Sequence, residues 1–169
     1  MRRWSACGPG MRFSDMRTMS KDIAVIGGGA AGMMAAIAAA EQGARVCLLE
    51  PNQRLGKKLN ITGKGRCNVT NNCSMEELMA HIPRNGRFLY SAFSHFGSGE
   101  TIAFFEGLGV PLKTERGNRV FPVSDSAFDV SAALERRLKA LRVRIARDRA
   151  VSLEIADGAA RGVAGERGS

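Results

Sequence analysis

Four residues in the first third of the chain have the types and spacing needed to hold a nucleotide. Gly27, Gly29 and Gly32 follow an apolar run with the spacing GxGxxG, and Glu50 closes the next apolar run. The first glycine allows a sharp turn out of a strand, the second lets the backbone approach a pyrophosphate, and the third brings a helix close to the strand. A carboxylate at the place of Glu50 accepts hydrogen bonds from both hydroxyls of a ribose.

The elements around these residues follow in the order that such a site requires. We expect strands over 22–26 and 45–49, joined by a helix over 30–42, and this crossover makes the strands parallel. The N–H groups of the first helical turn, around Ala30 and Ala31, then face the phosphates. The sequence therefore predicts a site for the ADP half of a dinucleotide. A carboxylate at the place of Glu50 repels a 2′-phosphate, so NADP is disfavoured as the ligand of this particular site. The alternative is a glycine-rich turn before an ordinary helix.

Composition sets the class of protein. The 169 residues are 44% hydrophobic and 24% charged, which is ordinary for one globular domain with its own core. No apolar run is long enough to span a bilayer, and the basic start lacks the apolar region of a secretory signal, so we expect a cytoplasmic protein. Residues 1–20 are expected to be a disordered arm or a mis-assigned start, and residues 21–169 the folded part.

Metal, disulfide and nucleic-acid functions are not expected. The four cysteines form no CxxC pair and the two histidines have no ligand spacing. The net charge of +9 raises the question of RNA, but the basic residues are scattered and one Trp and one Tyr make no stacking platform. The basic cluster from Arg136 to Arg149 is interpreted as a solvated face. The sequence does not reveal the oligomeric state.

Helices and strands also alternate through the rest of the chain. A capping box at Ser74 predicts a short helix before Pro83. Further helices are expected over 98–108 and from Ser126 onward, a short extended piece at 120–122, and a third parallel strand over 142–146. Residues 151–155 alternate in polarity before the turn Asp157–Gly158, which predicts a hairpin whose partner strand is barely started. The segment 51–72 is polar and contains several glycines, and it is too long to serve only as a connection between two elements.

The tract RLGKKLNITGKGRCNVTN, residues 54–71, narrows the class further. Together with residues 25–32 and RVFPVS at 119–124, it resembles the bacterial FAD-dependent oxidoreductases described as aminoacetone-oxidase-like or NAD(P)/FAD-dependent, some of which are bile-acid enone reductases. The resemblance covers about residues 21–162. It implies an α/β, Rossmann-like FAD/NAD(P)-binding fold of the glutathione-reductase type, with a parallel sheet, helices and the start of a β-meander. Relatives are much longer, so it also implies an incomplete N-terminal fragment that is inactive by itself.

The resemblance implies FAD as the cofactor and NAD(P)H as the electron donor, with hydride passing through the flavin to an unknown small-molecule substrate. The implied cofactor-binding residues are Gly27, Gly29, Ala30, Ala31, Gly32, Glu50, Gly56, Lys57, Lys58, Thr62, Gly63, Gly65, Arg66, Cys67 and Asn68, with Val151 opening a strand whose backbone meets the adenine. Solvated lysines at 57 and 58 and simple packing of Cys67 are the alternatives for those positions. No catalytic acid or base is identified. The other hypothesis for the whole chain is a non-catalytic Rossmann-like module that binds a nucleotide or RNA, against which the tract 54–71 argues.

Overall fold

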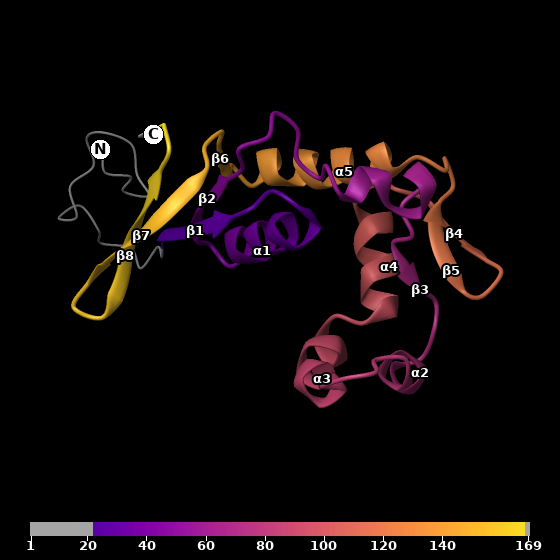
Figure 1. The fold of residues 1–169 in the computed structure, drawn as a ribbon. Coiled ribbons are helices and arrows are strands. Elements are labelled where there is room, and N and C mark those ends of the chain that lie inside the picture. Colours follow the sequence, from indigo (N-terminus) through magenta and orange to yellow (C-terminus); the bar gives the residue numbers. More distant parts are fainter. Residues whose placement is uncertain (1–21, 168–169) are drawn as a thin grey trace. The chain divides into compact units, whose positions relative to one another are not determined.

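The structure is a computed structural model that describes residues 22–167 (Figure 1). The predicted arm over residues 1–20 lies outside the described residues. The described chain divides into two compact units. Unit 1 comprises residues 22–57 and 134–167, and unit 2 comprises residues 58–133. Each unit contains a sheet of its own.

The main sheet of unit 1 is parallel, with the strand order β1-β2-β6 (Figure 1). Its elements are β1 (Asp22–Ile26), α1 (Ala30–Glu41), β2 (Arg45–Leu49) and β6 (Arg144–Ala146). The central strand β2 pairs with both neighbours, and its last four residues are buried. Helix α1 packs on β1 and β2 through Met33, Ala36 and Ile37, all at most 1% exposed. The predicted order of strand, helix, strand and third parallel strand is therefore confirmed.

A hairpin of β7 (Ala150–Ala156) and β8 (Ala159–Gly165) completes unit 1. Its turn lies at Asp157 and Gly158, which both have positive φ, as predicted for this dipeptide. The expectation of a barely started partner strand is wrong, because β8 is seven residues long and paired along its length. Val163 of β8 packs into the cluster of Cys47, Leu49 and Ala146, so the parallel sheet supplies the apolar surface that orders β8.

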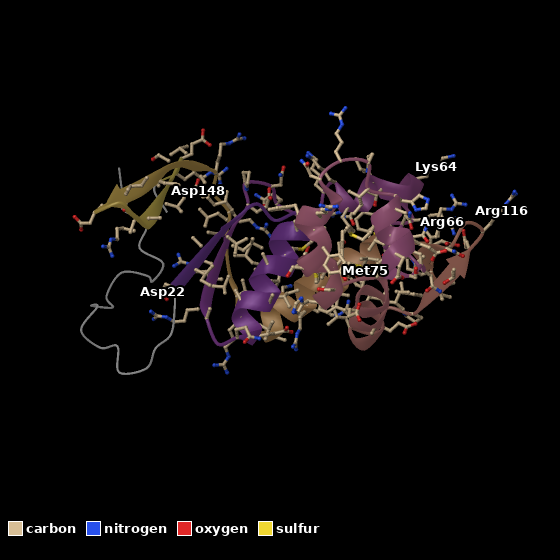
Figure 2. The ribbon with its side chains drawn as sticks, turned by 90° about the horizontal axis from the view of Figure 1, so that it is seen from below. Asp22, Lys64, Arg66, Met75, Arg116 and Asp148 are labelled. Carbon is tan, nitrogen blue, oxygen red and sulfur yellow. The ribbon has the colours of Figure 1, made fainter. Side chains whose placement is uncertain are left out.

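The end of the hairpin is fixed by a buried acid. Asp148 is 1% exposed and lies at the base of the hairpin (Figure 2). Its Oδ1 accepts hydrogen bonds from the backbone N–H of Arg149 at 2.7 Å and of Arg167 at 3.1 Å. These bonds join the chain just before β7 to the chain just after β8.

Helix α5 (Ala127–Ala140) crosses from unit 2 into unit 1. Leu134 and Leu138 in its second half are fully buried, and Arg137 pairs with Glu41 of α1 at 2.6 Å. The helix begins directly after Ser126, where the sequence predicts its start. Among the described residues no helix has both the length and the apolar character needed to cross a bilayer.

Unit 2 is built on an antiparallel sheet with the order β3-β5-β4. Its elements are η2 (Leu59–Gly65), β3 (Thr70–Asn71), α2 (Met75–Ala80), α3 (Gly86–His95), α4 (Ser98–Gly107), β4 (Leu112–Glu115) and β5 (Arg119–Pro122). The capping box of α2 is present, with Glu77 N donating to Ser74 Oγ at 3.2 Å and Ser74 N donating to Glu77 Oε2 at 2.8 Å. Neither α3 nor β4 was predicted from the sequence: α3 has no side-chain cap, and β4 is a four-residue strand that pairs with β5.

Candidate nucleotide-binding site

The three glycines of the GxGxxG turn have different surroundings. Gly27 leaves β1 with φ +101°, and its N–H donates to Leu49 O at 2.8 Å. A Cβ on Gly32 would stand 1.8 Å from Gly27 O, so the absence of a side chain lets α1 approach β1. A Cβ on Gly29 would meet nothing within 4 Å. Gly32 therefore serves the packing of the protein, whereas Gly29 borders open space.

The open space beside Gly29 lies at the N-terminus of α1. Gly29, Ala30 and Ala31 are exposed, and the first turn of the helix carries no acidic residue and no side-chain cap. The first N–H groups of a helix have no partner inside it, and the helix dipole favours a negative charge at this end. The turn is therefore suited to a phosphate group.

Glu50 is 8% exposed and is held by the backbone around it. Its Oε2 accepts a hydrogen bond from Gly28 N at 2.7 Å, and its Oε1 accepts from Asn52 N at 2.8 Å and Asn52 Nδ2 at 2.5 Å. Burial by itself would raise the pKa of Glu50, but these hydrogen bonds and the nearby charge of Arg147 outweigh burial and lower it. Glu50 is thus a buried carboxylate that stays ionised at neutral pH.

Three residues around Glu50 that sequence reasoning did not assign complete this site. Gly28 donates to Glu50, and its carbonyl accepts a hydrogen bond from Gly56 N at 2.8 Å. A Cβ on Gly28 would stand 2.5 Å from Leu55 Cδ2, so no larger residue fits without rearrangement. Arg147, which follows β6, donates from Nη1 to Asn52 O at 2.9 Å. The amide of Asn52 two residues after a strand-end carboxylate is a turn signal that was available from the sequence.

The second predicted group of cofactor residues, Lys58 to Asn68, lies in unit 2. The segment passes through a run of left-handed backbone: Gly63, Lys64, Gly65 and Cys67 all have φ between +55° and +85°. Lys64 and Cys67 are not glycines, so the surrounding contacts have to hold this conformation against its cost. A Cβ on Gly63 would stand 3.0 Å from Asn68 N and 3.2 Å from the Phe121 ring.

Arg66 is the residue that fixes this segment to the β4–β5 hairpin. Its Nη2 donates to Glu115 Oε1 at 2.5 Å and to Asp125 Oδ1 at 2.6 Å, and its Nε donates to Asp125 Oδ1 at 2.8 Å. The guanidinium carbon lies 4.2 Å from the centroid of the Phe121 ring. Figure 2 shows Arg66 beside Lys64 at this end of unit 2. Most of the polar capacity of Arg66 is therefore used by the protein itself.

The other polar residues of the segment also bond within unit 2. Asn68, with its amide turned to suit both acceptors, donates to Thr70 O at 2.9 Å and Val120 O at 3.2 Å. Thr62 Oγ1 donates to Leu59 O at 2.7 Å. Burial raises the pKa of the Cys67 thiol despite a hydrogen bond with Thr62, so this thiol is protonated at neutral pH and is not a poised nucleophile.

The structure collects the predicted residues into two groups. Unit 1 brings together the glycine turn, the start of α1, Glu50 and Gly56, with Lys57 exposed next in the chain. Unit 2 holds Lys58, Thr62, Gly63, Gly65, Arg66, Cys67 and Asn68. Val151 lies on β7 and is 56% exposed. The cofactor role of each remains a prediction, and the geometry of the first group is the one suited to an ADP moiety.

Relatives of known name match most of the chain. It is 42% identical over 125 residues to the 3-dehydro-bile acid delta(4,6)-reductase of Clostridium scindens, which covers 73% of this chain and 30% of that protein. It is 35% identical over 109 residues to the ribosomal RNA dihydrouridine synthase of Escherichia coli, covering 64% of this chain and 26% of that protein. The chain thus spans less than a third of the length of these relatives.

Solved structures share the fold at low sequence identity. The 3-ketosteroid-delta4-(5alpha)-dehydrogenase of Rhodococcus jostii RHA1 superposes with a TM-score of 0.66 at 17% identity, covering 98% of this chain and 45% of that one. THI4 of Thermovibrio ammonificans superposes with a TM-score of 0.53 at 15% identity, covering 86% of this chain and 45% of that one. The sequence profile of the HI0933-like protein Rossmann domain matches residues 21–164. The predicted Rossmann-like fold and the family are therefore confirmed, and the chain belongs to the HI0933-like family of Rossmann FAD-binding proteins.

Proposed function

We propose that this chain is the FAD-binding part of an oxidoreductase that moves hydride between a nicotinamide, FAD and a small-molecule substrate, in the cytoplasm. The observation that carries the proposal is the open space beside Gly29, next to the first turn of α1 and to the ionised Glu50. A pyrophosphate and a ribose are the groups that such a turn accepts. The donor set therefore fits the ADP half of FAD.

In this proposal the chain binds and orients the cofactor. The N–H groups at the start of α1 hold the pyrophosphate, and Glu50 accepts from the adenosine ribose. FAD, when bound, supplies the capacity to accept and donate hydride. Unit 2 contains a segment with left-handed backbone at Gly63, Lys64, Gly65 and Cys67, and Arg66 keeps that segment on the β4–β5 hairpin. The reacting proton donor is not assigned to a residue of this chain.

The names of the two relatives guide the proposed substrate class. A delta(4,6)-reductase and a dihydrouridine synthase both saturate a carbon–carbon double bond next to a carbonyl group. In such a reduction one carbon receives a hydride and the other receives a proton, and the nicotinamide is the ultimate source of the electron pair. We infer the same class of reaction for the protein to which this chain contributes, with a small enone as substrate.

The test is cofactor binding by the chain itself. Calorimetric titration with FAD and with ADP is expected to show one site for each, and Gly29→Val is expected to bind neither. The electron donor is tested on the longer protein to which this chain contributes. There, NADH and NADPH are each added without oxygen, and reduction of the flavin is measured as the loss of its visible absorbance. A chain that binds neither ADP nor FAD would contradict the proposal.

RNA is a second candidate substrate, favoured by the names of two relatives and by the charge of the chain. Two relatives, from Escherichia coli and Haemophilus influenzae, are named ribosomal RNA dihydrouridine synthase. The chain also carries a net charge of +9. An observation against RNA binding is that three arginines of the basic cluster from Arg136 to Arg149 already contact other residues of the protein. Arg137 pairs with Glu41, Arg147 donates to Asn52 O, and Arg149 pairs with Glu166. Retention of labelled ribosomal RNA on a filter, compared at low and high salt, separates RNA binding from the small-substrate proposal.

A further inference from the structure

The acceptor atoms around Glu50 can be counted one by one. A carboxylate oxygen offers about two lone pairs. Oε1 already accepts from both Asn52 N and Asn52 Nδ2, so it is filled by the protein. Oε2 accepts from Gly28 N and keeps one position open. The carboxylate held in this way has one open acceptor position, whereas a ribose presents two hydroxyl donors.

The second acceptor at this turn belongs to Asn52. Its side chain is exposed, and while Nδ2 donates to Glu50, its amide oxygen Oδ1 has no hydrogen-bond partner within residues 22–167. A further hydrogen bond holds the backbone of this turn, because Arg147 donates to Asn52 O at 2.9 Å. Because Nδ2 is held by Glu50, the amide plane is fixed, and Oδ1 can accept a hydrogen bond from a hydroxyl group of a ligand.

We propose that Asn52 is a second ribose-recognition residue, which shares the two hydroxyls of the adenosine ribose with Glu50 and orients the Glu50 carboxylate. Arg147 is a positioning residue that acts through Asn52. This inference rests on the proposed function, because it assigns a further residue to the nucleotide site of unit 1. It explains why Asn52, two residues after Glu50, donates to the Glu50 carboxylate from both its backbone N–H and its side-chain amide.

The experiment compares ADP with 2′,3′-dideoxy-ADP, using calorimetry on the full chain. Wild type is expected to prefer ADP by about 30-fold or more, from one charged and one neutral hydrogen bond. Asn52→Ala is expected to reduce that preference by about 3- to 10-fold, the value of a neutral hydrogen bond. Gln53→Ala, an exposed neighbour in the same turn, is the matched control and keeps the wild-type preference.

A second pair of variants is compared by the pH dependence of ADP affinity, which a general loosening of the turn would not change. Asn52→Asp keeps the acceptor but sets a second carboxylate against Glu50, so binding of ADP weakens at neutral pH and recovers as acid protonates the pair. Gln53→Glu adds the same charge in the same turn without contacting Glu50 and lacks this recovery.

The outcomes separate this inference from the function on which it rests. If wild type binds ADP and its dideoxy analogue equally, or if Asn52→Ala weakens both ligands by the same factor, Asn52 does not read the ribose, while the nucleotide site stands. If wild type binds neither nucleotide, both the site and this inference are overturned.

Discussion

Glu50 in unit 1 and Arg66 in unit 2 are charged residues from the two sequence motifs, and their hydrogen-bond partners differ in kind. Glu50 is buried and bonded to backbone N–H groups and one amide, and its Oε2 still has an open acceptor position. Arg66 is paired with two carboxylates and stacked on Phe121. The difference shows that a charged residue within a motif can keep an open hydrogen-bonding position or can use its hydrogen bonds to fix its own loop, and that only its partners in the structure tell which.

Filling the turn beside Gly29 gives the largest effect that this comparison predicts. Gly29→Val is expected to lower ADP affinity by about 100-fold or more, since the side chain enters the space for the phosphates. The melting temperature is expected to stay unchanged, because Gly29 has φ −76° and a Cβ there meets nothing within 4 Å. Calorimetry and thermal unfolding measure the two effects.

The control for that variant is the third glycine of the same turn. Gly32→Ala places a Cβ 1.8 Å from Gly27 O and is expected to destabilise the protein by about 2 kcal/mol or more. A Gly29→Val protein that unfolds like Gly32→Ala would show that the space beside Gly29 is not free.

Removing the carboxylate of unit 1 is the next largest effect. Glu50→Ala is expected to weaken ADP binding by about 1.5–3 kcal/mol, because a charge-assisted hydrogen bond to the ribose is lost. The protein also loses stability, since Gly28 N is left buried without its acceptor. Titration calorimetry with Glu50→Gln, which keeps an acceptor oxygen without the charge, should give an intermediate affinity. Wild-type affinity in both variants would remove Glu50 from the site.

Changing Arg66 tests the other side of the comparison. Arg66→Lys loses the two-pronged contact with Asp125 and the stacking on Phe121, so the melting temperature is expected to fall. ADP affinity is expected to stay at the wild-type value, because the proposed ADP contacts lie in unit 1. Thermal unfolding should show a smaller difference at high salt, since the pairs are partly exposed. A loss of ADP affinity would contradict the division of roles.

Lowering the pH is expected to have the smallest effect on stability, and this effect is specific to carboxylates whose pKa is lowered in the folded protein. The pKa of Glu50 is lowered from 4.5 in the folded protein, so its contribution to stability is complete above 4.5 and is lost as the pH falls below that value through the folded pKa. Hydrogen bonds from Lys113 and Arg66 lower the pKa of Asp125 too, and that contribution is lost in the same direction. Denaturant unfolding of wild type and Glu50→Gln between about pH 6 and pH 3 measures the Glu50 share. That share should persist in high salt, whereas the Asp125 share should shrink.

Much of unit 1 followed from local sequence signals. Short apolar runs, the GxGxxG spacing and the Asp157–Gly158 turn predicted strands and helix with bounds within a residue or two of those observed. These signals are local because each depends on backbone conformation or on the periodicity of one face. The length of β8 was underestimated, because its residues are mostly small and its order comes from pairing with β7 and from Val163 on the parallel sheet.

Unit 2 was less predictable. Helix α3 lacks a side-chain cap and buries no residue fully, so its start is not marked in the sequence. The partners of Arg66 are 49 and 59 residues away along the chain, and no local pattern links them.

The sequence by itself determined the Rossmann-type turn, the succession of strands and helices along unit 1 and the presence of an acid directly after β2, because glycine conformations and apolar periodicity act within a few residues. Only the tertiary structure decided which atoms remain open to a ligand. Gly28, Asn52 and Arg147 come from three different segments, and their hydrogen bonds around Glu50 fill some acceptor positions and leave others free. Such bonds depend on distances in space between segments that the chain sequence does not specify locally.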